Sequence, residues 1–507
     1  MGSAWRVAAV IAALSVIAPE GRAQQVAPAA ATDAGTPAVA AGDRAGLETR
    51  IDEILAEAAP YLGPGRVGVY AVDLTSGDPL YQHDPDGAYN LASNTKILTT
   101  AAALHILGPA FRFRTAVSAP KIEGDAVVGN LWITGGGDPT LQTTDLRALA
   151  ADLAARGIKK INGALAVDDT MFDDALLPPH YDSQPKEQAA FRAPVGALNL
   201  DYNSIVVVIR PNPGGAGPAL VTLDPPGDYA TLTGQVQTSA TGRTRVRIDT
   251  VETDGRFELR LGGQVAATSQ VLHYRRRISD PTAFAAAALR AVLAEYGIRV
   301  RKKRLVREPV PAGAVVIGQH DSAELAEVIR NLGKHSNNFT AETLLKTIGA
   351  ATLTEARPAT WNDGLTAVRN YLTLAMGLPP NGFRYDNGSG LFDASAVSPR
   401  QLVAVLQHAW SDFRIGVDLA ASLSTAGVDG TLRRRMKGVP ATGRVRAKTG
   451  TLAQVTTLAG FVAVDARRPV AFAVLVNDLA KSGHGKRAGR AAQDQIAIAL
   501  AEFLGAR

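Results

Sequence analysis

Residues 91–98 read Leu-Ala-Ser-Asn-Thr-Lys-Ile-Leu and open an apolar, alanine-rich run that continues to Leu104. If Ser93 begins a helix, Lys96 lies one turn further on and on the same face. A serine hydroxyl is a weak nucleophile at neutral pH, and an adjacent base that removes its proton activates it. The spacing therefore predicts a nucleophile with its own base, although serine and lysine also occur at this spacing by chance in helix starts whose lysine is merely solvated.

A second cluster lies between two helical patterns, where residues 334–338 read Lys-His-Ser-Asn-Asn. Ser336 offers another hydroxyl that can relay a proton. The amide of Asn338 can both donate to and accept from a peptide backbone. Ser336 is therefore predicted to assist bond cleavage, and Asn338 is predicted to align a peptide substrate.

A third cluster, residues 446–451, reads Arg-Ala-Lys-Thr-Gly-Thr at the entry of the C-terminal strands. On an edge strand, Lys448 with the hydroxyls of Thr449 and Thr451 would offer a cation and donors to a carboxylate. Gly450 would let a substrate approach the backbone closely, so that a peptide aligns along the edge by strand addition. Each motif alone is weak, but the order S-x-x-K, S-x-N, K-T-G is that of serine β-lactamases and penicillin-binding proteins.

With these motifs the chain resembles the D-Ala-D-Ala carboxypeptidase/endopeptidases called class C low-molecular-mass penicillin-binding proteins. The resemblance extends from about Gly46 to the C-terminus. It includes further stretches outside the motifs, at residues 134–141, 168–172, 197–203, 387–391 and 426–432. It implies an α/β fold of the serine β-lactamase/transpeptidase type, an antiparallel sheet flanked by helices, with a long β-rich insertion that forms one or two extra domains.

The resemblance also implies a role for each matching residue. Ser93 would attack the carbonyl between two D-alanines and form an acyl-enzyme, with the backbone N–H groups of Ser93 and Thr451 as the oxyanion hole. The implied catalytic residues are Ser93, Lys96 and Ser336, and the implied substrate-binding residues are Asn338, Lys448, Thr449, Gly450 and Thr451. The implied partners are peptidoglycan stem peptides, with β-lactams as covalent inhibitors, and no cofactor or metal is expected.

Two stretches depart from the family pattern. Relatives usually read Asp-Gly-Ser-Gly-Leu-Ser-Arg where residues 386–393 read Asp-Asn-Gly-Ser-Gly-Leu-Phe-Asp, so Asp393 stands where arginine is expected. The tryptophan and aspartate usual in the insertion are also not evident near residues 181–187. Because these positions help bind a diaminopimelic side chain in the family, recognition of the stem peptide is left open.

The chain of 507 residues, 46% of them apolar, is long enough for a large core and roughly two or three domains. Residues 1–23 combine Arg6, an apolar run and a small-residue cleavage site, which predicts a secretory signal peptide and a periplasmic or otherwise extracytoplasmic protein. An uncleaved anchor is the alternative. The chain has no cysteine, which is ordinary for an exported bacterial protein. Its net charge is +6. This charge is explained either by peripheral association with an anionic wall or membrane surface or by compositional bias.

Composition divides the rest of the chain. Residues 24–45 predict a disordered linker, with order beginning near Gly46. Helix and hairpin patterns before Ser93 and strands with a helix at the C-terminus indicate that the two ends share one sheet. The predicted catalytic domain is therefore split between residues 46–111 and 318–507, around a β-rich insertion at 112–317 with a second subdomain at roughly 198–275.

Several local predictions accompany this division. Strand-like runs occur at 127–133, 165–167, 205–209 and 244–248, a helix is expected at 281–296, and Asp321 is expected to cap the helix that follows it. Further strands are expected at 455–458, 460–464 and 470–476, before a last helix at 488–504.

Other interpretations of the same residues are weaker. The three glycines at 135–137 predict a tight turn, because no Gly-Lys-Ser/Thr follows them. The basic runs at 275–277 and 301–304 predict solvated faces rather than nucleic-acid binding, since the protein is expected to be exported. A catalytic role for His335 is unnecessary beside Lys96. The rival functions are a β-lactamase or esterase of the same fold and a non-catalytic wall-binding protein.

Overall fold

The computed structural model describes residues 41–183, 187–253, 256–464, 469–480 and 483–505. The predicted signal peptide and most of the predicted linker lie outside these residues. The first helix, α1 (Ala41–Leu62), begins before Gly46, so the last residues assigned to the linker are helical. In the described part of the chain, no helix combines the length and apolar composition that crossing a bilayer requires.

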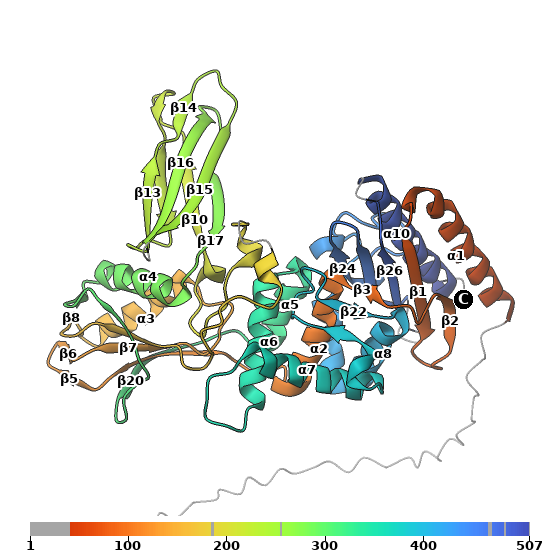
Figure 1. Ribbon diagram of the computed structural model, residues 1–507, viewed down its shortest axis with the longest axis horizontal. Coiled ribbons are helices and arrows are strands. Elements are labelled where there is room, and N and C mark those ends of the chain that lie inside the picture. The colour runs from red at the N-terminus through yellow and green to blue at the C-terminus, as the bar shows by residue number, and fades with distance from the viewer. Residues whose placement is uncertain (1–40, 184–186, 254–255, 465–468, 481–482, 506–507) are drawn as a thin grey trace, which may run out of the picture. The chain divides into compact units, whose positions relative to one another are not determined.

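A six-stranded sheet joins the two ends of the chain, as the sequence predicts (Figure 1). Its strand order is β2-β1-β26-β25-β24-β23, and the pairings are antiparallel. The strands are β1 (Arg66–Asp73), β2 (Pro79–His83), β23 (Ser424–Thr425), β24 (Val445–Thr451), β25 (Thr456–Val462) and β26 (Val470–Asn477). A small neighbouring sheet consists of β3 (Tyr89–Asn90), β21 (Arg384–Tyr385) and β22 (Ser395–Val397).

Helices cover both faces of the six-stranded sheet. Strands β25 and β26 are buried along their whole length, so alternate side chains enter two different cores. Leu458 and Val474 pack with α1 and with α10 (Gly483–Gly505), whereas Ala459 and Leu475 belong to the core on the other face. The helices of that second core are α2 (Thr95–Leu107), α5 (Leu325–His335), α6 (Asn338–Thr352), α7 (Trp361–Met376), α8 (Pro399–Ser411) and α9 (Phe413–Ser422).

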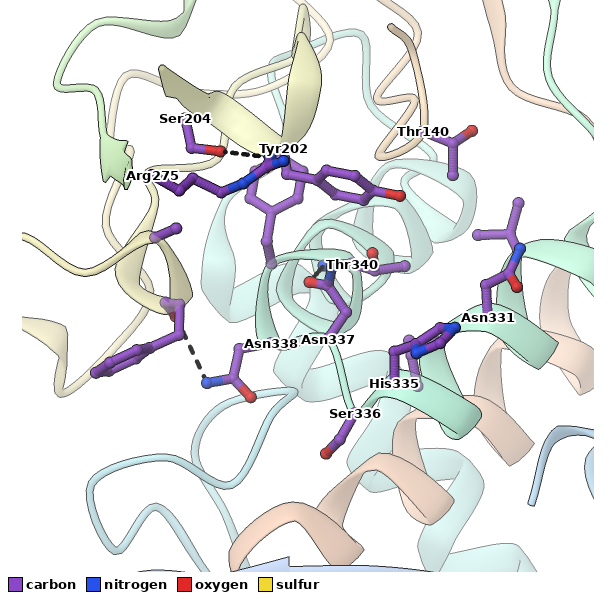
Figure 2. A pocket seen from close by; sticks show the side chains of 15 residues that line it. Thr140, Tyr202, Ser204, Arg275, Asn331, His335, Ser336, Asn337, Asn338 and Thr340 are labelled. Atoms are coloured by element: carbon purple, nitrogen blue, oxygen red, sulfur yellow. Dashed lines mark hydrogen bonds between the residues drawn. The ribbon is translucent and has the colours of Figure 1, made fainter. Parts of the chain in front are cut away.

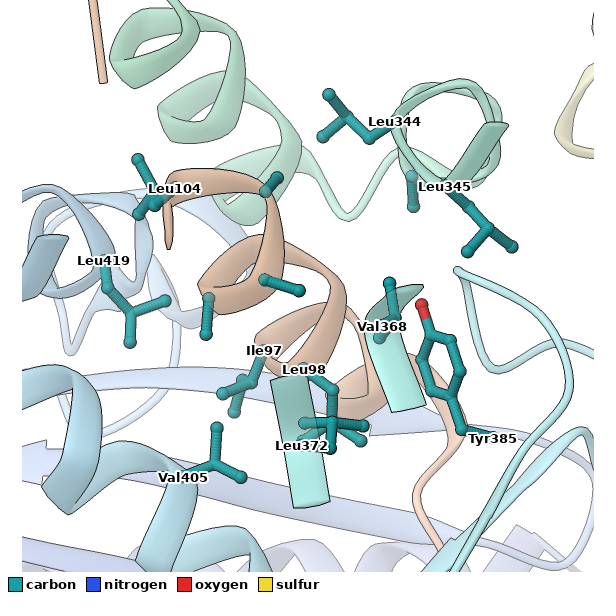
Figure 3. Packing of buried hydrophobic residues seen from close by; sticks show 14 of the residues in the cluster. Ile97, Leu98, Leu104, Leu344, Leu345, Val368, Leu372, Tyr385, Val405 and Leu419 are labelled. Atoms are coloured by element: carbon teal, nitrogen blue, oxygen red, sulfur yellow. The ribbon is translucent and has the colours of Figure 1, made fainter. Parts of the chain in front are cut away.

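Helix α2 lies in the middle of the second core. Figure 3 shows its side chains, among them Ile97 and Leu98, facing residues of the neighbouring helices. Residues 101–103 are three fully buried alanines, whose small side chains allow close approach of other helices. The helix that follows Ser93 is therefore fixed on all sides by packing.

The inserted part has its own sheets and its own core. One five-stranded sheet runs β19-β9-β7-β4-β20 beside a four-stranded sheet β18-β8-β6-β5. These strands are β4 (Arg114–Ala119), β5 (Lys121–Glu123), β6 (Ala126–Val128), β7 (Leu131–Thr134), β8 (Lys160–Ile161), β9 (Leu165–Asp168), β18 (Arg299–Val300), β19 (Leu305–Arg307) and β20 (Val315–Asp321). Helices α3 (Thr143–Ala155) and α4 (Pro281–Glu295) pack with them.

Residues 204–277 form a further pair of sheets. One is three-stranded, in the order β12-β10-β17. The other runs β11-β14-β16-β13, with β15 also paired to β16. The strands are β10 (Ser204–Arg210), β11 (Gly217–Pro218), β12 (Leu220–Asp224), β13 (Ala230–Gly234), β14 (Gln237–Ser239), β15 (Arg245–Thr253), β16 (Arg256–Ala266) and β17 (Leu272–Arg277).

Three local predictions are wrong. Asp321 does not cap a helix, because it is the last residue of β20 and its carboxylate pairs with Arg114 at 2.8 Å. The run 127–133 is two strands, because Gly129 turns the chain with a φ of +88°. The two strands expected at 455–458 and 460–464 are the single strand β25, whose two faces are both buried.

Candidate active site

Ser93 lies in a tight turn in front of α2, within the short 3₁₀ helix at Ala92–Asn94. Ala92 has a φ of +46°, a left-handed conformation that costs a non-glycine residue about 1–3 kcal/mol. Its neighbours stabilise the turn, since Asn90 Oδ1 accepts from the Ala92 N–H at 2.7 Å and Thr457 donates to the Leu91 carbonyl at 2.9 Å. The nucleophile predicted from the sequence therefore has a fixed backbone.

The amine of Lys96 lies 3.0 Å from the hydroxyl oxygen of Ser93. Its other partners are Asn338 Oδ1 and the Ser389 carbonyl, each at 2.8 Å. The side chain is 1% exposed, and this burial lowers the pKa of Lys96 to about 7, while the charge of Glu342 acts in the opposite direction. At neutral pH a large fraction of Lys96 is therefore an uncharged amine beside a serine hydroxyl.

The turn between α5 and α6 presents Ser336 and Asn338 together. Ser336 ends α5 in the left-handed conformation, with a φ of +57°, and its N–H donates to the Leu332 carbonyl. Asn337 then caps α6 by accepting from the Thr340 N–H at 3.1 Å. This pair of helix ends fixes the residues on either side of Asn337.

Lys448 extends from β24 to the hydroxyl of Ser336, which its amine contacts at 2.8 Å. It also donates to the Thr449 carbonyl at 2.8 Å and is 1% exposed. Burial, with repulsion from Lys96 as a smaller cause, holds the pKa of Lys448 well below the usual value. Two buried amines thus flank the two hydroxyls, one amine beside each.

The remaining residues of the third motif lie on a largely open strand edge. Strand β23 pairs only with Arg446 and Ala447, so the pairing stops before Lys448. Thr449 donates to the Thr431 hydroxyl at 2.9 Å, and the exposed guanidinium of Arg490 donates to the Thr451 hydroxyl at 3.1 Å. Arg490 adds a positive charge to this edge that the sequence motifs did not indicate.

Glu342 is a second residue that sequence reasoning missed. It lies one turn after Asn338 on α6, is fully buried, and accepts from the backbone N–H groups of Gly388 and Ser389 at 2.9 Å each. Burial raises the pKa of its carboxyl. Since the Ser389 carbonyl is a partner of Lys96, Glu342 positions one side of the Lys96 amine. The sequence feature that indicates Glu342 is an acidic residue within the apolar run after Asn338.

The stretch that departs from the family pattern lies next to this loop. Asn387 is buried, and its side chain closes the turn by accepting from the Gly390 N–H at 2.8 Å. Asp393 accepts from Asn90 at 2.5 Å and pairs with Arg384 at 3.1 Å. An acidic group thus occupies the position where the family pattern has arginine.

A cavity of about 520 Å³ opens beside Ser336 and Asn338 (Figure 2). The inserted part contributes to its wall, and the Asn338 amide is 3.5 Å from the Phe191 carbonyl. His335 is exposed at this cavity, whereas the amine next to the Ser93 hydroxyl is that of Lys96. Among the described residues, no group of acidic and histidine side chains is arranged to hold a metal ion.

Comparisons with known proteins agree with this geometry. The model of the D-Ala-D-Ala carboxypeptidase 3 (S13) family matches residues 47–503. The D-alanyl-D-alanine carboxypeptidase of Actinomadura sp. strain R39 is 35% identical over 478 residues, which cover 90% of this chain and 85% of that protein.

A solved structure agrees with the fold. The crystal structure of penicillin-binding protein 4 (DacB) from Haemophilus influenzae superposes with a TM-score of 0.71 and 26% identity, over 90% of this chain and 99% of the other. The same protein has also been solved in complex with a β-lactam. The predicted fold class is confirmed, and the chain belongs to the D-Ala-D-Ala carboxypeptidase (S13) family of serine peptidases.

Proposed function

We propose that this chain cleaves the D-Ala-D-Ala bond, or the D-alanyl cross-link, of peptidoglycan stem peptides through an acyl-enzyme on Ser93. The observation that carries the proposal is the 3.0 Å contact between the Ser93 hydroxyl and a lysine amine whose pKa is lowered to about 7. An amine that is largely neutral at working pH can remove the hydroxyl proton as the oxygen attacks.

Acylation forms a bond between Ser93 Oγ and the carbonyl carbon and breaks the bond from that carbon to the amide nitrogen. The proton of Ser93 passes to Lys96. The leaving nitrogen takes a proton from Ser336, which Lys448 replenishes across their 2.8 Å contact. The proton that Lys96 took from Ser93 replaces the one that Lys448 gave up, so that both amines return to their starting protonation states. Water then hydrolyses the ester: neutral Lys96 takes a proton from the water as its oxygen attacks the carbonyl carbon and returns that proton to Ser93 Oγ as the ester bond breaks.

Substrate alignment is assigned to the remaining motif residues. The Asn338 amide would bond the substrate backbone, and the terminal carboxylate would meet the hydroxyls of Thr449 and Thr451 on the open edge of β24, with Gly450 between them. Arg490 contributes charge beside Thr451. The backbone N–H groups of Ser93 and Thr451 would bind the developing oxyanion, a contribution of ~3–4 kcal/mol per donor.

The cellular setting belongs to the same proposal. The N-terminal pattern of residues 1–23 supports export, and action on the cell wall supports a periplasmic or other extracytoplasmic location. We retain the division into a split catalytic domain, 46–111 with 318–507, and an insertion at 112–317. The inserted part has a core of its own, which supports it, while Phe172, Ala193, Val195 and Ala197 of that part belong to the core of the catalytic helices. β-Lactams would acylate Ser93 and leave it slowly. The H. influenzae relative, solved in complex with a β-lactam, supports the binding of these antibiotics.

Intact-mass measurement after incubation with benzylpenicillin tests the proposal. A stable adduct of one penicillin is expected, and the Ser93→Ala variant should show none, because it lacks the attacking oxygen. If no adduct forms and the antibiotic stays unchanged, the proposed enzymatic function is contradicted. Hydrolysed antibiotic without an adduct would indicate a β-lactamase instead.

A further inference from the structure

A cluster of exposed lysines and arginines lies in the inserted part, outside the reaction site. Its members come from two segments that are far apart in the chain, residues 159–160 and 299–304. None of them lines the cavity beside Ser336, and the proposed reaction gives them no role. This basic patch consists of seven exposed side chains, those of Lys159, Lys160, Arg299, Arg301, Lys302, Lys303 and Arg304.

Backbone hydrogen bonds hold the two segments of the basic patch side by side. Strand β18 pairs in parallel with β8, and Arg299 lies opposite Lys160 in this pairing. The N–H of Arg299 donates to the Lys159 carbonyl at 3.0 Å, and the N–H of Arg301 donates to the Ile161 carbonyl at 3.0 Å. The fold therefore places the two groups of cations next to each other.

Helix α4 fixes the loop that follows β18. The guanidinium of Arg290 donates to the carbonyl of Lys302 at 3.2 Å and to the carbonyl of Lys303 at 2.8 Å. These bonds engage the backbone of the loop, while both lysines stay exposed. Arg290 thus adds a further positive charge beside the patch and holds its most basic stretch in place.

Few acidic side chains accompany this charge. Residues 156–163 and 296–307 contain no aspartate or glutamate. Asp125 pairs with Lys160 at 3.2 Å, and among the described side chains the other members of the patch form no ion pair. Like charges held close together repel one another, so an anionic partner would offset a cost that the fold carries.

The chemistry of the patch fits a flexible anionic chain better than a bilayer. Protein surfaces that enter a bilayer combine cations with apolar side chains that insert between the lipids. Within residues 156–163 and 296–307, Tyr296 is the one large apolar side chain that is exposed. The four consecutive cations at 301–304 also diverge along a loop, so a chain can contact them from several sides whereas a flat surface meets them from one.

We infer that the basic patch binds the carboxylates of the peptidoglycan polymer, as a second contact separate from the reaction site. Peptidoglycan is the partner because the proposed function acts on this polymer, so the inference rests on that function. The stem peptides along a glycan strand carry repeated carboxylates, which match a cluster of cations. A strand held at the patch raises the effective concentration of its other stem peptides at Ser93.

Co-sedimentation of the full chain with insoluble peptidoglycan, freed of attached phosphate polymers, tests the inference. All proteins in the experiment carry Ser93→Ala, so the polymer is not cut. A patch variant with R301Q, K302Q, K303Q and R304Q is expected to bind with a Kd at least about tenfold higher at low salt, because four cations near the anionic partner are lost. Its binding should also depend less steeply on salt.

The matched control replaces four exposed cations outside the patch, with R210Q, R243Q, R245Q and K437Q. It has the same net charge as the patch variant and should keep the affinity of the parent. Thermal unfolding of both variants checks their fold. Peptidoglycan whose carboxylates have been amidated tests the inference without a substitution in the patch, and the parent should bind it as weakly as the patch variant binds the untreated polymer.

Equal affinity of the patch and control variants would overturn the inference, and so would undiminished binding to the amidated polymer. Patch-dependent binding to phosphatidylglycerol vesicles without binding to peptidoglycan would assign the patch to a membrane and overturn it as well. The proposed peptidase stands in each case if the chain with Ser93 intact forms the penicillin adduct. Absence of that adduct would instead remove the proposed function, whatever the patch binds.

Discussion

Lys96 has three hydrogen-bond partners, and its two protonation states use them differently. An ammonium has three N–H donors, which match Ser93, Asn338 and the Ser389 carbonyl. A neutral amine has two donors and a lone pair. If the donors remain with Asn338 and Ser389, the lone pair is directed at the Ser93 hydroxyl. The same contacts thus orient the amine before and after it takes the proton.

This geometry predicts how acylation depends on pH. Because only neutral Lys96 can act as base, the rate of acylation by benzylpenicillin should rise through the Lys96 pKa of about 7 and then level off. The negative charge of Glu342 raises that pKa. Glu342→Gln should therefore shift the rising limb of the pH profile to lower pH. It should also lower the plateau rate, because a glutamine cannot accept from both backbone N–H groups as the carboxylate does.

Stopped-flow acylation rates between about pH 5 and 9 would measure the shift. Glu355→Gln, which removes a carboxylate from an exposed position, serves as the control and should keep the limb in place. A rate that does not vary with pH in the unmodified chain would contradict Lys96 as the base. An unshifted limb in Glu342→Gln would contradict the electrostatic link between the two residues.

At the scale of elements, β24 and the turn that holds Ser93 are in direct contact. A Cβ atom at Gly450 would lie 2.2 Å from Thr457 Oγ1 and 2.7 Å from the Leu91 carbonyl. The glycine is thus required by the enzyme's own backbone, in addition to the substrate approach expected from the sequence. The strand that carries Lys448 can pack against the nucleophile turn only without a side chain here.

Gly450→Ala should therefore separate these two elements. We expect a loss of stability of about 1–3 kcal/mol from overpacking and a marked fall in the rate of penicillin acylation, because Ser93 is displaced. Urea unfolding and adduct formation would measure the two effects. Gly382→Ala, where the nearest atom to an added Cβ is 3.7 Å away, is the control. An acylation rate equal to that of the unmodified chain would show that the contact does not position Ser93.

Sequence patterns predicted the elements that depend on local spacing. The helix after Ser93, the helix that begins at Asn338 and the hairpin of β1 and β2 have periodicities that tertiary contacts support. The prediction failed at Asp321, where pairing of β20 with β4 outweighed a plausible cap. It also failed in β25, where burial of both faces removes the alternation that would have marked one continuous strand.

At the scale of the whole molecule, the same distinction applies to the site. Ser93, Lys96, Ser336, Asn338 and Lys448 are recognisable because each belongs to a short motif. The contacts of Glu342 with Ser389 and of Asn338 with Phe191 join residues far apart in the chain, so no local pattern contains them. The cavity that Arg275 shares with Ser336 likewise exists only after the insertion has folded against the catalytic helices.

One buried lysine joins the inserted part to helix α6, which carries Asn338 and Glu342. The amine of Lys346 is fully buried, pairs with the Asp173 carboxylate at 2.5 Å and donates to the Ala175 carbonyl at 3.0 Å. The Trp361 ring nitrogen donates to the same carbonyl at 2.7 Å, and the Lys346 amine lies over the face of the Trp361 ring in a cation–π contact. Burial lowers the pKa of Lys346, which shows the cost of holding this amine away from water.

Lys346→Met keeps the apolar stem of the side chain and removes the amine. Because the Asp173 carboxylate then loses its cation, we expect a loss of unfolding free energy approaching about 3 kcal/mol. The variant should still form the penicillin adduct at low temperature. It should lose the ability to form the adduct at a lower temperature than the unmodified chain does, because α6 is no longer held by the segment that contains Asp173 and Ala175. Calorimetry with adduct formation measured along the same temperature series would test this, with exposed Lys437→Met as the control. Unfolding temperatures that agree between Lys346→Met and the control would mean that packing around Phe172 and Trp361 joins the two parts without the lysine.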